Sequence, residues 1–174
     1  MTSDPLLVVA RGAVLFSMAI VALIGLLFLM LAPVMVFGRL DILAEVSMAQ
    51  GLTASGFFGI GAIMLLVAAM AGCAFLFLRH LLRIIDSVGK GDPFNPVNAA
   101  RLAAMGWLTL GVEAISVPAG LIGAWIASIV KAGGDVDIGI GLSPSGVLLA
   151  IVLFILARVF RQGAEMRAEL EGTV

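Results

Sequence analysis

The chain has 174 residues, of which 62% are hydrophobic and only 12% are charged, and its mean hydropathy is +1.21. Soluble domains are typically about 45–50% apolar and about 25% charged, so this chain has too few polar side chains to solvate a globular surface. The composition therefore predicts a single membrane domain over residues 1–174. The net charge of −1 argues against direct nucleic-acid binding, and the single cysteine, Cys73, excludes an internal disulfide.

Long uncharged runs predict four membrane-spanning helices, because about 20 apolar residues cross the core of a bilayer. The first run, residues 12–38, lies between Arg11 and Arg39. A signal peptide is the competing interpretation, but its hydrophobic region is shorter, about 7–15 residues, so we favour a span. The expected spans are residues 12–38, 50–78, 102–130 and 140–160.

Turn and capping signals predict where the helices end. The apolar periodicity continues past residue 78 among charged residues, so the second helix is expected to leave the membrane and end at Gly89. Asn95-Pro96 has the form of an N-cap followed by a first helical residue, and Ser143-Pro144 repeats that signal. We therefore predict helices near residues 7–37, 47–88, 96–131 and 144–170.

The segment before the last helix leaves two interpretations open. Apolar residues at 136, 138, 140 and 142 alternate with Asp137 and glycines, which is the period-2 pattern of a strand. The segment is then either a plain loop or a short extracellular strand that pairs with residues 40–46. The predicted fold is an all-α, polytopic bundle of four transmembrane helices, with at most this short β pairing.

The distribution of Lys and Arg predicts the orientation. Eight of the ten basic residues fall at the N-terminus, in the connection 79–101 or in the C-terminal tail. They are Arg11, Arg79, Arg83, Lys90, Arg101, Arg158, Arg161 and Arg167. Only Arg39 and Lys131 lie on the other side. Because positive charge marks cytoplasmic segments, we expect both termini, the loop 79–101 and the tail 161–174 in the cytoplasm, with the protein in the cell membrane.

Glu113 is the one acidic residue inside a predicted span, and Thr109 and Ser116 share its helix face. Together they form a candidate intramembrane polar site. A buried acid in lipid is costly unless it faces a partner or a cavity. One interpretation is a proton or cation site; the other is a protonated side chain hydrogen-bonded across the bundle. Apart from Arg158 at the end of the last span, the other spans hold no Asp, Lys, Arg or His, so a proton relay would have no second member.

The sequence predicts no enzyme, no metal site and no cofactor. The only histidine, His80, has no second His or Cys at ligand spacing and no acid placed to orient it. The turn Gly89-Lys90-Gly91 lacks the frame of a phosphate-binding loop.

Two stretches, residues 89–106 and 157–174, resemble a prokaryotic membrane-protein family catalogued as domain of unknown function 2975. The residues that match its loop motif are Gly91, Pro93, Phe94, Asn98, Arg101, Leu102 and Gly106. Those that match its tail motif are Phe160, Arg161, Gly163 and Glu165. The order Arg101-Leu102 reverses the usual pair, and the ending Glu-Gly-Thr-Val departs from the usual one.

The resemblance implies a partner but no established activity. Members of the family are often encoded beside a small helix-turn-helix regulator, so the first hypothesis is a membrane-bound regulatory or interaction protein. A small proton- or cation-coupled transporter or channel that uses Glu113 is the alternative. The sequence assigns no homo-oligomeric state.

The regulatory hypothesis has a physical form. The loop and tail emerge on one side, and an apolar stripe on the tail is expected to cover the end of the second helix. The stripe is Val159, Met166 and Leu170, and the covered residues are Leu81, Ile84, Ile85 and Val88. We expect Phe94 and Phe160 to fix the loop. The structural alternative is that Pro93, Phe94 and Phe160 simply close the end of the bundle.

Overall fold

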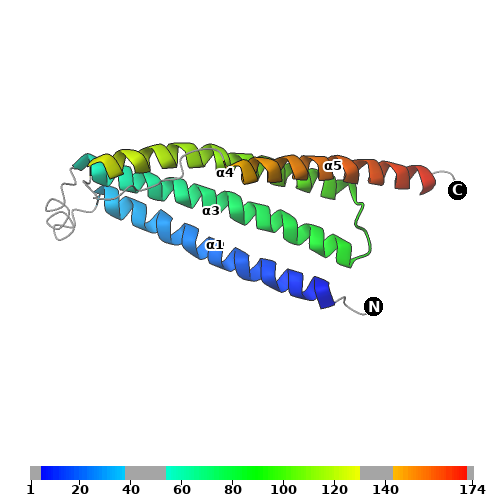
Figure 1. Ribbon diagram of the computed structural model, residues 1–174. Helices are drawn as coiled ribbons and strands as arrows, with labels where there is room; N and C mark the ends of the chain where they lie inside the picture. Colours follow the sequence, from blue (N-terminus) through cyan, green and yellow to red (C-terminus); the bar gives the residue numbers. More distant parts are fainter. Residues whose placement is uncertain (1–4, 38–53, 130–142, 172–174) are drawn as a thin grey trace.

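The structure is a computed structural model that describes residues 5–37, 54–129 and 143–171. These ranges form four helices, shown in Figure 1: α1 (Pro5–Phe37), α3 (Ala54–Gly89), α4 (Pro96–Ile129) and α5 (Pro144–Glu171). No strand occurs within the described ranges, and the all-α prediction is confirmed. The β pairing weighed between residues 40–46 and 136–142 lies outside them.

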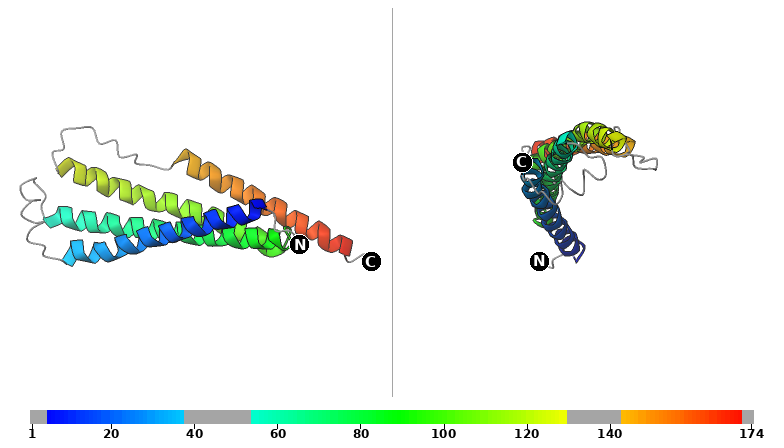
Figure 2. Two further views of the ribbon diagram at one scale, coloured as in Figure 1. Left: turned by 90° about the horizontal axis from the view of Figure 1, so that it is seen from below. Right: turned by 90° about the vertical axis from the view of Figure 1, so that its left-hand side faces the viewer.

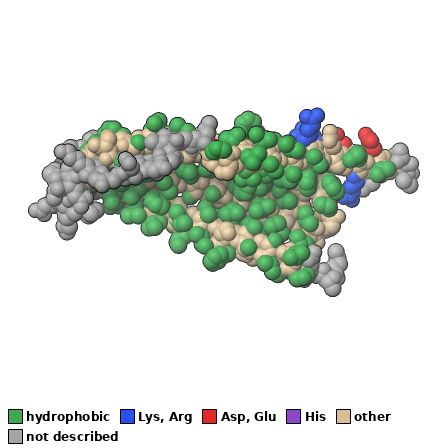
Figure 3. All heavy atoms as spheres, viewed as in Figure 1, with side chains coloured by type: hydrophobic (Ala, Val, Ile, Leu, Met, Phe, Trp, Pro, Cys, Tyr) green, Lys and Arg blue, Asp and Glu red, His purple; other side chains and the backbone are tan. Residues whose placement is uncertain are grey.

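Each helix contains a segment of 27 to 34 residues that is long and apolar enough to cross a membrane. Hydrophobic side chains cover the flank of the molecule, and charged side chains gather at the end where α5 continues (Figure 3). Large apolar residues are exposed along the helices, among them Phe16 at 69% and Leu23 at 70%. A lipid environment solvates such surfaces, so the exposure fits a chain whose solvent is the bilayer.

The local signals locate the helix ends as predicted. α3 ends at Gly89, where Gly91 follows with a φ of 79°, a conformation that favours glycine. Asn95 precedes α4, and its side-chain Oδ1 accepts a hydrogen bond from the backbone N–H of Val97 at 3.0 Å. Ser143 holds the same position before α5, where its carbonyl accepts from the N–H of Gly146 at 3.0 Å.

The helices pack in an open, curved row that follows the chain order (Figure 2). α3 lies against α1 on one side and α4 on the other, and α5 lies against α4. Between the described helices, no other pair brings Cα atoms within 8 Å. Because lipid is as apolar as a leucine side chain, both faces of such a row are left to the bilayer without the penalty that water imposes.

The buried core lies toward the α3–α4 turn and joins three helices. Leu102 and Met105 of α4 pack with Leu153 and Ala157 of α5. Phe77, Leu81 and Ile84 of α3 and Phe160 of α5 pack against this cluster. Of the four α3 residues expected to lie under the apolar stripe of the tail, Leu81 and Ile84 pack against this cluster instead, and Val88 is exposed.

The predicted stripe is wrong. Val159, Met166 and Leu170 are 53%, 60% and 73% exposed and do not cover α3. α5 instead turns inward the face that carries Ala157 and Ala164, which are 4% and 8% exposed. Alanine permits a close helix approach, whereas bulkier side chains hold helices apart, so the smaller residues face α4.

Candidate functional site

Glu113 is buried in the middle of α4, with 8% of its surface exposed. Its Oε2 atom accepts a hydrogen bond of 2.7 Å from the backbone N–H of Ser143, the residue before α5. The first backbone N–H groups of a helix have no partner within the helix, and this end of the helix dipole is positive. Glu113 therefore acts as an acceptor that caps the first turn of a neighbouring helix.

Gly146 provides the space for this carboxylate. A Cβ atom built on Gly146 would lie 1.6 Å from Oε1 of Glu113 and 2.6 Å from its Cδ. Any side chain at this position would collide with the acid, so the first turn of α5 and Glu113 are sterically matched. The sequence analysis missed Ser143 and Gly146 as partners of Glu113, because a backbone N–H carries no residue signature.

Thr109 and Ser116 do not join the carboxylate. The Thr109 hydroxyl donates to the carbonyl of Met105 at 3.0 Å, and the Ser116 hydroxyl donates to the carbonyl of Glu113 at 2.7 Å. Both hydroxyls donate to backbone carbonyls of their own helix, as is common for these residues in apolar helices. Of the three predicted polar residues, Glu113 alone makes a contact between helices.

α5 begins near the height of Glu113 on α4. α5 begins partway along α4 and continues beyond its neighbours at the other end (Figures 1 and 2). Twelve residues separate Arg101 from Glu113, which is about 18 Å along a helix, near the middle of a bilayer core of about 30 Å. With Arg101 at the edge of the bilayer core, as the sequence predicts, the helix start that Glu113 caps would lie at membrane depth, where an unpaired N–H group is costly.

A second group of predicted residues meets at the α3–α4 turn, centred on Asn98. Asn98 is completely buried, and its amide nitrogen donates to the Ser87 hydroxyl at 2.5 Å and to the Pro93 carbonyl at 3.0 Å. Its amide oxygen accepts a bond of 2.8 Å from Arg101, whose guanidinium also reaches the carbonyl of Arg83 at 3.1 Å. One side chain thereby ties the end of α3, the turn and the start of α4 together.

The same turn is joined to α5 by aromatic packing. The rings of Phe94 and Phe160 have centroids 5.5 Å apart and are tilted by 40°. A Cβ atom on Gly163 would lie 2.7 Å from Cδ1 of Phe94, so the ring rests on the bare glycine backbone. Gly163 is therefore required for the close approach of the turn and the tail.

An ion pair completes this junction. Asp92 accepts hydrogen bonds from Arg167 of α5 at 2.7 Å and from the Asn95 amide at 2.9 Å. Arg161 and Glu165, which the family resemblance also named, point to the exposed side of α5. The structure thus brings Pro93, Phe94, Asn98, Arg101, Phe160 and Gly163 into one junction and leaves Arg161 and Glu165 outside it. We call this arrangement the turn–tail junction.

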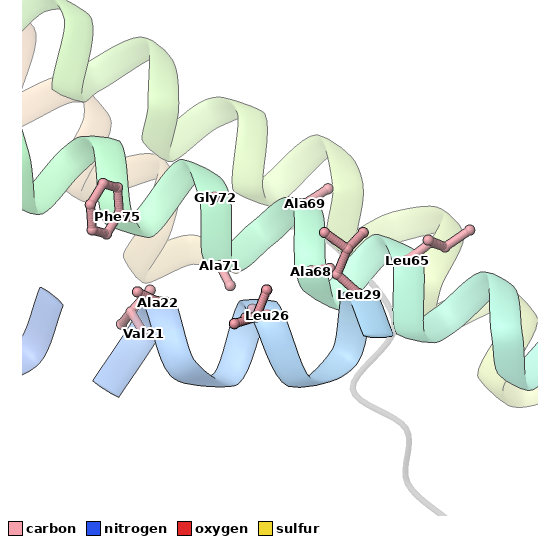
Figure 4. A pocket seen from close by; sticks show the side chains of 11 residues that line it. Val21, Ala22, Leu26, Leu29, Leu65, Ala68, Ala69, Ala71, Gly72 and Phe75 are labelled. Atoms are coloured by element: carbon pink, nitrogen blue, oxygen red, sulfur yellow. The ribbon is translucent and has the colours of Figure 1, made fainter. Parts of the chain in front are cut away.

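An apolar groove lies between α1 and α3 (Figure 4). It has a volume of 490 Å³, and small residues, including Ala22, Ala68 and Gly72, form much of its lining. Gly25 lets α1 approach closely here, since a Cβ on it would lie 3.1 Å from the Cβ of Ala71. The groove carries no polar side chain, so its chemistry is that of lipid packing.

Within the described residues, no three His, Cys, Asp or Glu side chains lie together as a set of metal ligands would. The four apolar helices define a multi-pass membrane protein. Residues 62–174 match the family described as "Protein of unknown function (DUF2975)", and the chain belongs to this family. No curated protein and no solved structure matches the chain.

Proposed function

We propose that this protein is a membrane-bound interaction protein of the cell membrane, whose turn–tail junction presents α5 to a soluble regulatory protein in the cytoplasm. The family resemblance favours a small helix-turn-helix regulator as that partner. The positive charges at the end of the molecule that carries the turn–tail junction support a cytoplasmic location for the junction, by the positive-inside rule. In this proposal the chain has no catalytic role.

The observation that carries the proposal is an apolar surface beyond the depth of the membrane. Met166 is 60% exposed and lies eight residues past Arg158, which is about 12 Å along α5. Leu170, one turn further along the same face, is 73% exposed, whereas Val159, also on this face, lies at the end of the predicted span 140–160. Lipid tails do not reach this part of the helix, and exposed apolar side chains grouped on one face are typical of protein-binding surfaces.

The opposite side of the tail supports the same view. α5 is held in a fixed orientation by two contacts with the turn, Phe94 against Gly163 and Asp92 on Arg167. Ala164 on the same side of the helix is buried. A binding surface on a held helix loses little conformational entropy when a partner docks. The junction residues that the family resemblance named would then position the surface, while Val159 and Met166 make the contact.

The test is affinity capture of the detergent-solubilised protein from its own cells, with the bound proteins identified by mass spectrometry. We expect a helix-turn-helix protein to be recovered with the parent chain and lost with Met166→Glu, which places a charge in the apolar surface. Ala168→Glu is the matched control, because it adds the same charge on another exposed face of the same helix. Equal recovery with Met166→Glu, or recovery of no such regulator, would contradict the proposal.

Orientation is tested separately. Reporter fusions after residue 174 and at residue 133 should report the cytoplasm and the opposite side, respectively. A cytoplasmic signal at residue 133 would place the tail outside and remove the basis of the proposed interaction.

Proton- or cation-coupled transport through Glu113 is the second candidate. It is supported by a buried acid in the middle of α4 beside the start of α5, an arrangement of the kind that transporters use for ion binding. The hydrogen bond from Ser143 weighs against it, because the carboxylate already has a partner within the chain. Ion-dependent flux in liposomes that Glu113→Gln abolishes would favour transport over interaction.

A further inference from the structure

A polar pocket of 330 Å³ opens at the turn, between the end of α3 and the start of α4. Three cationic side chains line it, Arg83, Lys90 and Arg101, together with two acids, Asp86 and Asp92. By count alone the pocket is close to neutral. The partners of each group show that it is not.

Both acids are neutralised from outside the pocket. Asp86 forms an ion pair of 3.3 Å with Arg11 of α1, and Asp92 forms one of 2.7 Å with Arg167 of α5. Neither Arg11 nor Arg167 lines the pocket. The two negative charges are thus compensated by cations that belong to neighbouring helices.

The three cations of the pocket have no such compensation. The Arg101 guanidinium is held by two neutral oxygens, the carbonyl of Arg83 and the amide oxygen of Asn98. Across the described residues, no acid lies within ion-pair distance of the Arg83 or Lys90 side chains. The pocket therefore carries an excess of positive charge around one fixed guanidinium, which is the electrostatic environment that an anion requires.

The surroundings of the pocket indicate where that anion comes from. Val97 lines the pocket and is 51% exposed, and Trp107, six residues past Arg101, is 68% exposed. Exposed tryptophan beside basic residues is typical of the level where lipid headgroups meet the hydrocarbon. An anion bound here would lie at headgroup depth, with apolar protein surface directly beside it.

We propose that this pocket binds a phosphate group, carried by a phospholipid headgroup of the leaflet on the side of the α3–α4 turn. Arg101 would fix the phosphate, while Arg83 and Lys90 close around it as Asp86 and Asp92 stay engaged with α1 and α5. Free inorganic phosphate shares this chemistry and is the other source to distinguish. The site is independent of the proposed protein partner, because it uses a different surface.

The test is native mass spectrometry of the whole chain released from detergent, titrated with phosphatidylglycerol or phosphatidylcholine, with or without inorganic phosphate. We expect Arg83→Gln/Lys90→Gln to weaken phosphatidylglycerol binding by about thirtyfold, since each surface cation contributes roughly a factor of five. Only side chains change, so the bond to the Arg83 carbonyl is kept. The control is Arg158→Gln/Arg161→Gln, which removes the same charge from the exposed side of α5.

Tight binding of phosphatidylglycerol that inorganic phosphate does not displace, lost in the pocket variant and kept in the control, supports the lipid source. Displacement by millimolar inorganic phosphate supports the phosphate site but contradicts the lipid source. If phosphatidylglycerol binding weakens equally in both variants, the lipid is attracted by the overall positive charge of the protein and not by the pocket. If binding is unchanged in the pocket variant, the lipid does not contact Arg83 or Lys90. Either of these last two results overturns the proposal.

Discussion

Replacing Gly146 by alanine tests the match between Glu113 and the first turn of α5. The new Cβ would lie 1.6 Å from Oε1 of Glu113, so the carboxylate must move and lose its bond to Ser143. Displacing the packed side chain and leaving the partly buried Ser143 N–H without a partner costs about 1.5–3 kcal/mol. Alanine in place of glycine stabilises a helix by about 0.5–1 kcal/mol. We therefore expect Gly146→Ala to destabilise the protein by about 0.5–2.5 kcal/mol, the difference between these two effects.

The sign of this effect depends on Glu113. In a Glu113→Ala background the collision is absent. Gly146→Ala should then stabilise the protein by about 0.5–1 kcal/mol, because a helix favours alanine over glycine. The two substitutions are then coupled by about 1.5–3 kcal/mol. Unfolding by sodium dodecyl sulfate in mixed micelles, followed by far-ultraviolet circular dichroism of all four variants, measures this coupling. Additive effects of the two substitutions would refute the assignment of Glu113 as the cap of α5.

Three further predictions concern the end of the molecule that carries the turn. Asn98→Leu should lower the thermal unfolding temperature and cost about 2–4 kcal/mol, because it leaves buried polar partners unsatisfied; calorimetry in detergent measures it. Gly163→Leu should displace Phe94, which lies 2.7 Å from the position of the new Cβ, at a cost of about 1–3 kcal/mol. Limited proteolysis should then cut the tail faster than in the parent chain. Arg11→Gln should change stability by less than about 1 kcal/mol in the same micelle titration, because its ion pair with Asp86 is largely exposed to solvent.

Local chemistry made the helix ends predictable from the sequence. Gly89, Asn95-Pro96 and Ser143-Pro144 act through their own backbone and neighbouring residues, and the helices end or begin there. Length and the lack of charge likewise predicted four spans, because a bilayer has a fixed thickness.

The side on which each helix packs was harder to predict. In water an apolar stripe points to the core, but in lipid the same stripe faces the solvent equally well. The stripe through Val159 and Met166 was therefore assigned to the wrong side. Ala157 and Ala164 carried the better signal, since small residues mark close packing between helices in lipid.

The sequence predicted the polar sites only in part. The cost of an acid in lipid indicated that Glu113 faces a partner or a cavity, but its partner is the backbone of Ser143, which lies 30 residues away and has no side-chain signature. Asn98 was singled out through the family resemblance alone. Its role follows only from the structure, where Ser87, Pro93 and Arg101 converge on one amide.

Because the helices form an open row, the contacts of Glu113 and of the turn–tail junction are important for attaching α5 to the other helices. Among the described helices, α4 alone brings its Cα atoms within 8 Å of those of α5, so α5 depends mainly on this neighbour. Since lipid provides no hydrophobic drive for helix association, the attachment depends on close packing and on hydrogen bonds. α5 has both at separate heights: Glu113 at its first turn, the bare backbone of Gly106 under Phe154 in the middle, and the turn–tail junction at the far end. Two residues of the third contact, Asp92 and Arg101, also line the polar pocket at the turn.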